Sequence, residues 1–330
     1  MQVYIDTKQT SITVRNNSFF IKNETTNRII SPKRISSIAI TSNVTINTSA
    51  IKLAANNDVP IYFYNHEGKL IAQLNTPSFL KHAKLRLQQV AFIKSNQGII
   101  WAIDQLSLKT KLQIQTLQRL TQDKKELNEA IKPIIDSINE NKEQLQKVDL
   151  SNKKIRNTIM GIEGSLARLY YKAINIILPK QYQFTKRSRQ PGVDYYNTSI
   201  NYLYGLTYSH IRKAIHAAGL DTFMGALHTT PFKESLVFDS IEPFRPIIDR
   251  LLLQLCKDEL LQDIHFRKVA NGFWLSKEGK KLIITQYAGY LQKRIKIENK
   301  ITSIENHIYL SARKLKIQIQ NQENHVPNSL

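Results

Sequence analysis

Cysteine and long apolar runs are the scarcest features of this 330-residue sequence. The single cysteine, Cys256, excludes an intramolecular disulfide and a cysteine-rich zinc module, which fits a reducing compartment. No stretch approaches the 18 uninterrupted apolar residues of a membrane span, and Met1 to Thr10 has an acid at Asp6 and no apolar core of a signal peptide. We therefore expect a cytoplasmic protein without a membrane association.

Several short catalytic and nucleotide-binding motifs are also missing. The sequence contains no G-x-x-x-x-G-K-[ST], no G-x-G-x-x-G, no H-E-x-x-H and no C-x-x-C. Their absence removes the usual sequence signals of nucleotide-binding, metalloprotease and thiol redox proteins.

Acidic residues are few relative to basic ones. The 26 Asp and Glu residues face 47 Lys and Arg residues, which gives a formal net charge of +21. Because 42% of the residues are hydrophobic, the chain is expected to fold around a core rather than to form a disordered basic tail. A packed protein with this positive field is expected to bind a polyanion.

Up to about residue 90, apolar and polar residues alternate with a period of two, which is typical of half-buried strands. One short helix is predicted from Ser49 to Asn56. We therefore predict a small β domain of a few antiparallel strands and one helix. The predicted strands are Val3–Ile5, Ser11–Arg15, Phe19–Lys22, Ser36–Ile40, Ile61–Tyr64 and Leu70–Leu74.

After a transition near residues 75 to 95, the period becomes that of a helix. We predict two helices within Leu112 to Leu145 that are interrupted near Pro133, then helices at about 155–178 and 198–218. The predicted fold class is α+β, with a β-rich domain at residues 1–88 and a larger all-helical domain at residues 89–330.

Glu163 lies beside the apolar stripe of the predicted helix at 155–178, within the string "GIEGSLARLYY". Gly161 and Gly164 flank it, and each costs up to about 1 kcal/mol of helix propensity relative to alanine. Two interpretations stay open. A ligand or another backbone approaches closely at a functional Glu163, or the helix packs closely beside an ordinary exposed acid.

Asp239 and Glu242 stand three residues apart in a helical segment, so their side chains are expected to share one face. Apolar residues border both acids, and two like charges in such surroundings are costly. A divalent cation would relieve the repulsion. The alternative is that both acids pair with Arg245 or Lys233 at the surface, and the residues alone do not decide between the two.

His228 precedes a loop upstream of these acids. One imidazole with two or three carboxylates is a mostly hard ligand set, which suits Mn²⁺ or Mg²⁺ better than structural zinc. A carboxylate-bound divalent ion on a strongly basic protein favours nuclease or strand-transfer chemistry on a phosphodiester.

Three strings then stand in a familiar order and spacing. They are "GIEGSLARLYY", "YLYGLTYSHIRKAIHAAGLDTFMGALH" and "SLVFDSIEPFRPIID". Together they resemble the CRISPR-associated integrase of spacer acquisition, the universal adaptation nuclease. The β-rich start, the helical remainder and the string "NGFWLSKEGKKLII" extend the resemblance over essentially the whole chain.

The resemblance implies a metal, Mg²⁺ or Mn²⁺, that is held by Glu163, His228 and Glu242, with Asp239 as a supporting catalytic residue. Tyr204 in "YLYGLT" matches a tyrosine near the active centre of relatives. The implied reaction is attack by the 3′-hydroxyl of a captured double-stranded DNA fragment on a phosphodiester at the edge of a CRISPR repeat. The family also implies a homodimer, formed through the β domain, and a small ferredoxin-like second adaptation protein as partner.

Four basic residues are candidates for DNA contacts. Lys186, Arg187 and Arg189 lie in a basic loop and are expected to hold phosphates, and Arg245 is expected closer to the metal. Two other functions remain open. One is a basic DNA-binding scaffold without enzymatic activity, whose acids pair with Arg and Lys, and the other is a metal-dependent repair nuclease that does not integrate DNA.

Overall fold

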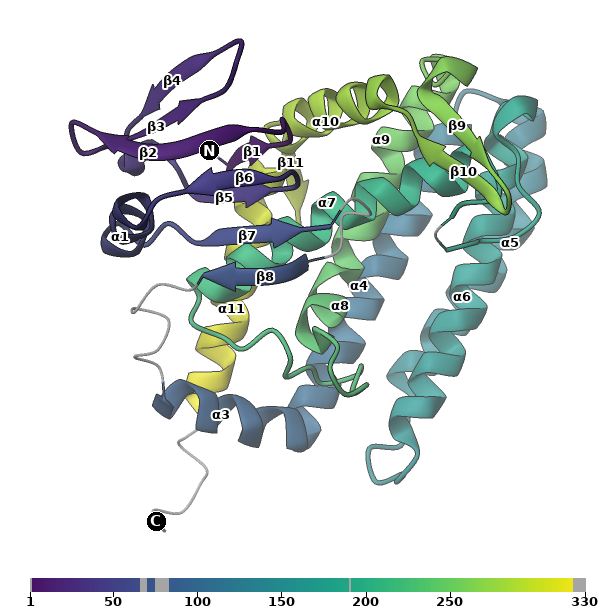
Figure 1. Cartoon of the computed structure of the whole chain (residues 1–330). Coiled ribbons are helices and arrows are strands. Elements are labelled where there is room, and N and C mark those ends of the chain that lie inside the picture. Colours follow the sequence, from purple (N-terminus) through teal and green to yellow (C-terminus); the bar gives the residue numbers. More distant parts are fainter. Residues whose placement is uncertain (1, 66–69, 75–82, 190, 323–330) are drawn as a thin grey trace. The chain divides into compact units, whose positions relative to one another are not determined.

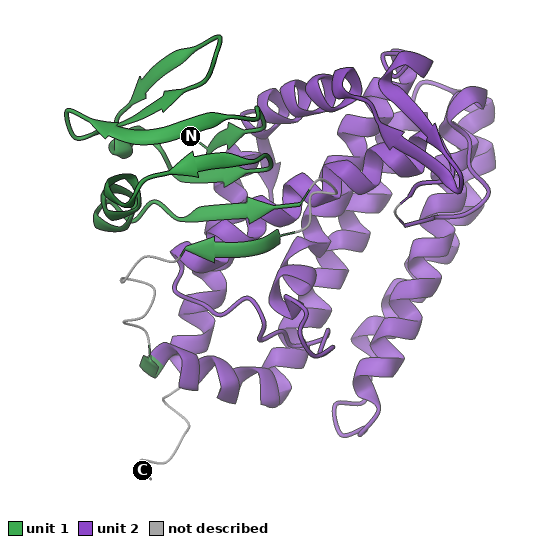
Figure 2. Ribbon diagram, viewed as in Figure 1, with its two compact units in different colours: residues 1–84 green, residues 85–330 purple. Residues whose placement is uncertain are grey.

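A computed structural model describes residues 2–65, 70–74, 83–189 and 191–322 of the chain (Figure 1). The chain divides into two compact units, unit 1 at Met1–Lys84 and unit 2 at Leu85–Leu330 (Figure 2). The sequence placed a boundary after residue 88, within a transition of which residues 75–82 lie outside the described residues. The two units have separate hydrophobic cores.

Unit 1 contains two four-stranded sheets. One has the order β1-β5-β7-β8 and the other the order β4-β3-β2-β6. The elements are β1 Gln2–Ile5, β2 Thr10–Arg15, β3 Ser18–Lys22, β4 Asn27–Ile30, η1 Pro32–Arg34, β5 Ser37–Ile40, β6 Val44–Ile46, α1 Thr48–Asn56, β7 Ile61–Tyr64 and β8 Leu70–Leu74.

The hairpin between β2 and β3 shows how the local sequence sets the register. Arg15 pairs with Ser18, and the two residues between them, Asn16 and Asn17, have φ angles of 48° and 53°. A two-residue hairpin turn with two positive φ angles matches the twist of the strands, and asparagine tolerates this conformation better than most residues. The turn places Ile12 and Phe19 in the core of unit 1.

The six predicted strands and the predicted helix are present. The prediction that all strands pair in the antiparallel direction was wrong. Strand β5 pairs in parallel with both β1 and β7, and β2 pairs in parallel with β6. Parallel neighbours need a crossover connection, and the segment from β6 through α1 supplies one between β5 and β7. Strands β4 and β6 were not predicted, because their short segments lack a clear alternation.

Unit 2 is mainly helical, which confirms the predicted α+β class. Helices α4, α5 and α6 pack side by side. The elements are α3 Ala83–Lys94, α4 Asn96–Thr121, α5 Lys125–Gln146, α6 Ile155–Ile177, η2 Lys180–Tyr182, α7 Tyr195–Ala217, α8 Ser235–Ile241, η3 Glu242–Phe244, α9 Arg245–Lys257, η4 Asp263–His265, β9 Phe266–Val269, β10 Gly272–Leu275, α10 Lys277–Leu291, β11 Arg294–Ile297, β12 Lys300–Ser303 and α11 Ile304–Asn321.

Two details of this unit differ from the predictions. The break between the first two long helices falls at residues 122–124, and Pro133 lies inside α5 on an exposed face, where water can satisfy the carbonyl that loses its partner. The domain is also not all-helical, because β9 pairs with β10 and β11 with β12 in two short hairpins.

Helix α6 carries Glu163, and its buried residues fix the helix against its neighbours. Ile159, Leu166, Tyr170 and Ala173 form one buried stripe of α6. Glu163 follows Ile159 by four residues, about one helical turn, so its orientation depends on this packing.

Among the described residues, no helix is long and apolar enough to cross a membrane.

Replacing Ile159 by alanine should destabilise the protein by about 2–5 kcal/mol, because the side chain is fully buried and its loss leaves a cavity. Met160→Ala is the matched control, since the adjacent side chain is 46% exposed and its loss should change stability by about 0.5 kcal/mol or less. Urea denaturation followed by circular dichroism measures both. Equal losses in the two variants would contradict this account of how α6 is held.

Candidate functional site

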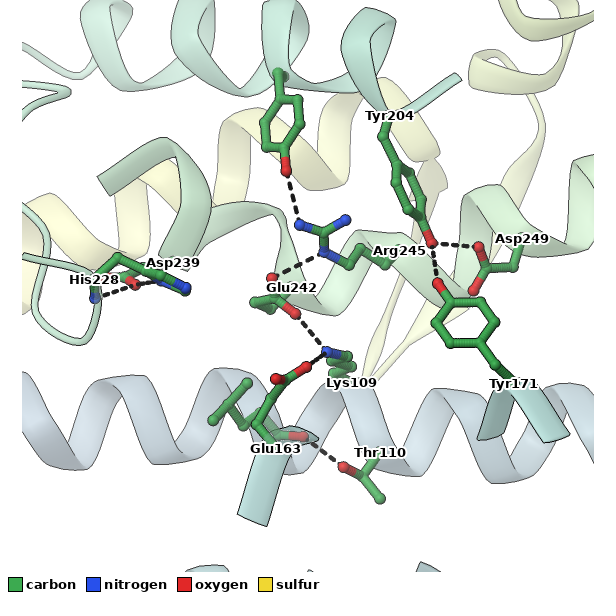
Figure 3. Close-up of polar contacts among 12 residues, drawn as sticks. Lys109, Thr110, Glu163, Tyr171, Tyr204, His228, Asp239, Glu242, Arg245 and Asp249 are labelled. Carbon is green, nitrogen blue, oxygen red and sulfur yellow. Dashed lines mark hydrogen bonds and ion pairs between the residues drawn. The ribbon is translucent and has the colours of Figure 1, made fainter. Parts of the chain in front are cut away.

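Two carboxylates from different elements converge on one lysine in unit 2 (Figure 3). The Nζ atom of Lys109 on α4 lies 2.5 Å from Oε1 of Glu163 on α6 and 2.6 Å from Oε2 of Glu242 in η3. The side chains of Lys109 and Glu242 are 7% exposed, and that of Glu163 is 32% exposed. The ammonium group therefore bridges one buried and one partly exposed carboxylate.

Charge pairing overcomes the cost of burial at this site. Burial disfavours the charged form of Lys109, but Glu242 and Glu163 together raise its pKa above the usual value. Burial likewise opposes the ionisation of Glu242, and Arg245 and Lys109 lower the pKa of that carboxyl to about 2. Both groups are charged at neutral pH.

Arg245 completes the neutralisation of Glu242. Its Nε donates to Oε1 of Glu242 over 2.8 Å, and its Nη2 donates to the hydroxyl of Tyr208 over 2.7 Å. The guanidinium carbon lies 4.6 Å from the centre of the Tyr204 ring. Pairing of Glu242 with Arg245, one of the two sequence-based alternatives, is present, but the pair is buried instead of lying at the surface.

Asp239 is neutralised separately from Glu242. Its carboxylate accepts the backbone amides of Ala226 and Leu227 at 2.6 and 3.0 Å and that of His228 at 3.1 Å. It also lies 2.6 Å from Nδ1 of the His228 ring. The hydrogen bond with Asp239 raises the pKa of His228, although burial of the ring opposes this.

Gly225 permits this close approach. A Cβ atom at this position would lie 2.8 Å from Oδ2 of Asp239 and 2.6 Å from the carbonyl carbon of Ser235. Any other residue would therefore push the loop away from α8.

The two acids and the two glycines differ in part from what the sequence suggested. Asp239 and Glu242 share no counter-charge from the protein, because each acid contacts its own partners. Gly161 and Gly164 do not mark a close approach of another backbone, because a Cβ atom at either position would meet no atom of a neighbouring described element within 4 Å. The alternative of a ligand beside Glu163 stays a prediction.

Tyr204 joins the acidic site to a second buried cluster. Its hydroxyl donates to Oδ1 of Asp249 over 2.5 Å and lies 3.0 Å from the hydroxyl of Tyr171. Asp249 on α9 is fully buried, and this burial raises its pKa from 3.8 to about 6, although the bond from Tyr204 acts in the opposite direction. Through Arg245, this cluster contacts Glu242.

The basic loop before α7 contains residues of two kinds. Lys186 and Arg189 are exposed to solvent. Arg187 is half-buried, hydrogen-bonds to Asn197 and Asn201, and lies 5.1 Å from the centre of the Tyr171 ring. Arg187 therefore holds the loop on α7, whereas its two neighbours face solvent.

The donor chemistry of the site suits a hard divalent cation, because two carboxylate oxygens already converge on one positive charge. In the described part of the chain, however, no three His, Cys, Asp or Glu side chains are grouped closely enough to hold a metal ion. The structure brings Glu163 and Glu242 together and places His228 with Asp239.

Sequence reasoning missed Lys109, Tyr171 and Asp249. Lys109 lies 54 residues before Glu163 and 133 before Glu242, so no local motif joins them. One signal was available, since Lys109 stands three residues from both Leu106 and Leu112, on the apolar stripe of α4. A lysine in such a position is rarely buried without a charged partner.

The fold and the site define an α+β protein with a strand-rich unit, a helical unit and a buried ionic site in a strongly basic chain. The family described as CRISPR associated protein Cas1 matches residues 3–289. The chain therefore belongs to the Cas1 family, which confirms the resemblance seen in the sequence.

Curated relatives match over nearly their whole length. CRISPR-associated protein Cas1 3 of Methanobrevibacter ruminantium is 31% identical over 293 residues, which cover 86% of each chain. CRISPR-associated endonuclease Cas1 of Thermotoga maritima is 25% identical over 305 residues, which cover 91% of each chain. The name of the Thermotoga maritima relative agrees with the predicted enzyme class, a metal-dependent DNA endonuclease and integrase.

Solved structures share the fold. A casposase bound to integration product superposes with a TM-score of 0.81 at 22% identity, covering 100% of this chain and 94% of that chain. A chain of a Cas6-RT-Cas1–Cas2 complex superposes with a TM-score of 0.79 at 20% identity, covering 98% of this chain and 35% of that chain.

Asp249→Asn tests the buried carboxyl. A carboxyl whose pKa is raised on folding, here from 3.8 to about 6, stabilises the fold below pH 3.8, and this contribution is lost as the pH rises through about 6. The variant lacks this titration. Its stability relative to the wild type should therefore increase by about 2 kcal/mol from about pH 4.5 to about pH 7.5, measured by urea denaturation. A constant difference over that range would show that Asp249 titrates normally.

Proposed function

We propose that this protein is a metal-dependent DNA integrase and endonuclease that inserts short foreign DNA fragments into a CRISPR array. The observation that carries the proposal is the convergence of the Glu163 and Glu242 carboxylates on the ammonium group of Lys109 in the helical unit of a Cas1-family chain. The net charge of +21 and the fold shared with a casposase bound to integration product also support it.

In this proposal, Glu163, Glu242 and His228 would hold Mg²⁺ or Mn²⁺, so the His228 ring would have to join the two glutamates, because no three such side chains are grouped closely enough among the described residues as they stand. When bound, the ion stabilises charge on the attacking and leaving oxygens of a phosphodiester. Asp239 does not touch the DNA but positions His228, since its bond to Nδ1 leaves Nε2 as the nitrogen for the metal. Tyr204 is likewise a positioning residue, because its ring lies against Arg245, which in turn binds Glu242.

The proposed reaction is a transesterification. The 3′-hydroxyl of the captured fragment loses its proton as its oxygen bonds to phosphorus at the edge of a repeat, the existing phosphorus–oxygen bond of the repeat strand breaks, and the leaving oxygen takes a proton. One ester replaces another, so the reaction needs no nucleoside triphosphate, which agrees with the missing phosphate-binding motifs. Water in place of the hydroxyl gives endonuclease activity.

The exposed side chains of Lys186 and Arg189 are the proposed phosphate contacts of the basic loop. Arg187 acts indirectly by holding the loop through Asn197 and Asn201. Arg245, which is engaged with Glu242 and Tyr208, serves the acidic site and not the DNA backbone.

We further propose that the protein works in the cytoplasm as a homodimer that forms through unit 1, with unit 2 as the catalytic domain. The proposed partner is a small ferredoxin-like second adaptation protein, which would bring two dimers to the ends of one fragment. The shared fold with a chain of a Cas6-RT-Cas1–Cas2 complex supports such an assembly.

One observation favours a second candidate, a DNA-binding scaffold without catalysis. Lys109 and Arg245 already neutralise Glu163 and Glu242, as the acids of a purely structural cluster would be neutralised. A scaffold would bind DNA with a steep salt dependence and without regard to metal ions. A repair nuclease, the third candidate, would cut DNA in the presence of metal without joining it.

The test is a joining assay with a labelled duplex that has 3′-hydroxyl ends and a supercoiled plasmid that carries a CRISPR repeat. The protein is assayed with its small partner in Mg²⁺, in Mn²⁺ and in EDTA. We expect metal-dependent transfer of label to the plasmid, and a loss of more than about 100-fold in Glu163→Gln and His228→Ala, because both changes remove a proposed metal ligand. Glu143→Gln, which changes an exposed acid of α5, is the control and should retain activity.

The other outcomes separate the candidates. DNA binding that persists in EDTA, with no joined or cut product under any condition, would support the scaffold. Metal-dependent cutting without joined product would support the repair nuclease. Joining that survives both substitutions would remove Glu163 and His228 from the proposed site.

A further inference from the structure

Lys109 occupies the position on which the two carboxylates converge. Its Nζ atom lies within 2.6 Å of an oxygen of both Glu163 and Glu242 (Figure 3). A divalent ion bound by the same two oxygens would need ligand distances of about 2.0–2.2 Å to each of them. The ammonium group and the ion cannot both occupy this point.

The charges of the cluster also oppose simultaneous binding. The two glutamates carry two negative charges, which Lys109 and Arg245 balance with two positive charges. A divalent ion added to this neutral set would leave two uncompensated positive charges beside the buried side chains of Lys109 and Glu242, which is unfavourable. One of the two basic side chains therefore has to withdraw if a divalent ion binds.

Lys109 is better suited to withdraw than Arg245. Arg245 is held by Glu242, by the Tyr208 hydroxyl and by the ring of Tyr204. Among the described residues, the hydrogen bonds of the Lys109 ammonium are those to the two glutamates. Its flexible four-carbon stem can swing without moving α4, whereas the planar guanidinium is fixed by several groups at once.

We propose that Lys109 is a built-in competitor of the divalent ion. The ammonium group and the ion bind the same two carboxylates in turn, so Lys109 holds Glu163 and Glu242 together and lowers the affinity of the site for metal. This inference rests on the proposed metal site. It assigns to Lys109, which lies outside the three sequence motifs, the tasks of positioning the two glutamates and setting the affinity of the site for metal.

The test measures the binding of Mn²⁺ to the full-length protein without DNA, by the electron paramagnetic resonance signal of free Mn²⁺. Lys109→Met removes the competing charge and should tighten Mn²⁺ binding by about tenfold or more. Lys111→Met makes the same change on an exposed side chain two residues along α4, and its affinity should stay near that of the wild type. Lys109→Arg keeps the charge and should not tighten binding.

Thermal unfolding gives a second readout. Without added metal, Lys109→Met should melt below the wild type, because Glu163 and Glu242 lose a counter-charge. Mn²⁺ should raise its melting temperature more than that of the wild type, since tighter binding to the folded state stabilises it more. If Lys109→Met does not fold, Lys109→Gln keeps a hydrogen-bonding side chain without the charge and serves in the same measurements.

The outcomes distinguish this inference from the proposed function. If Glu163→Gln and Glu242→Gln weaken Mn²⁺ binding but Lys109→Met and Lys109→Gln bind like the wild type or more weakly, the competition is overturned and the metal site stands. If neither the wild type nor any of these variants binds Mn²⁺, the metal site itself fails, and the competition fails with it.

Discussion

Neutralisation of buried charge is the constraint that organises unit 2. Glu242 and Lys109 are both buried, and each remains ionised because its partners outweigh the cost of removing it from water. These partners come from α4, α6, η3 and α9, so the ionic cluster fixes the relative positions of four elements. Loss of one member leaves a buried charge uncompensated, which typically costs about 3–5 kcal/mol. The ion pairs of the site therefore also stabilise the packing of these four elements.

The acids divide into two separately balanced groups. Asp239 is balanced by three backbone amides and the His228 ring, which fixes the loop after α7, whereas Glu242 is balanced by Lys109 and Arg245. Because each carboxylate has its own partners, the repulsion expected between two neighbouring carboxylates is relieved in this structure without a cation that both acids bind. It also assigns different tasks, since Asp239 shapes the histidine loop and Glu242 belongs to the cluster between the helices.

The sequence contained much of this arrangement, but only where the signal is local. Alternation located six strands, helical periodicity located the helix with Glu163, and the motifs selected His228, Asp239 and Glu242. Parallel pairing escaped prediction because it depends on crossovers between distant segments, and Pro133 was misread because a proline on an exposed helix face is tolerated. Lys109 escaped because its partners lie 54 and 133 residues away.

The separate cores of the two units bear on how loss-of-function variants are interpreted. Core residues of unit 1, such as Phe19 and Ile38, belong to one cluster, and those around Glu163, such as Ile159 and Leu166, belong to another. A substitution in the first cluster removes packing contacts within that cluster, which contains none of the residues that pack around Glu163. A loss of function caused by a substitution in the core of unit 1 is therefore attributed first to the function of that unit. A loss of function caused by a substitution in the second cluster is attributed first to a changed geometry of the acids.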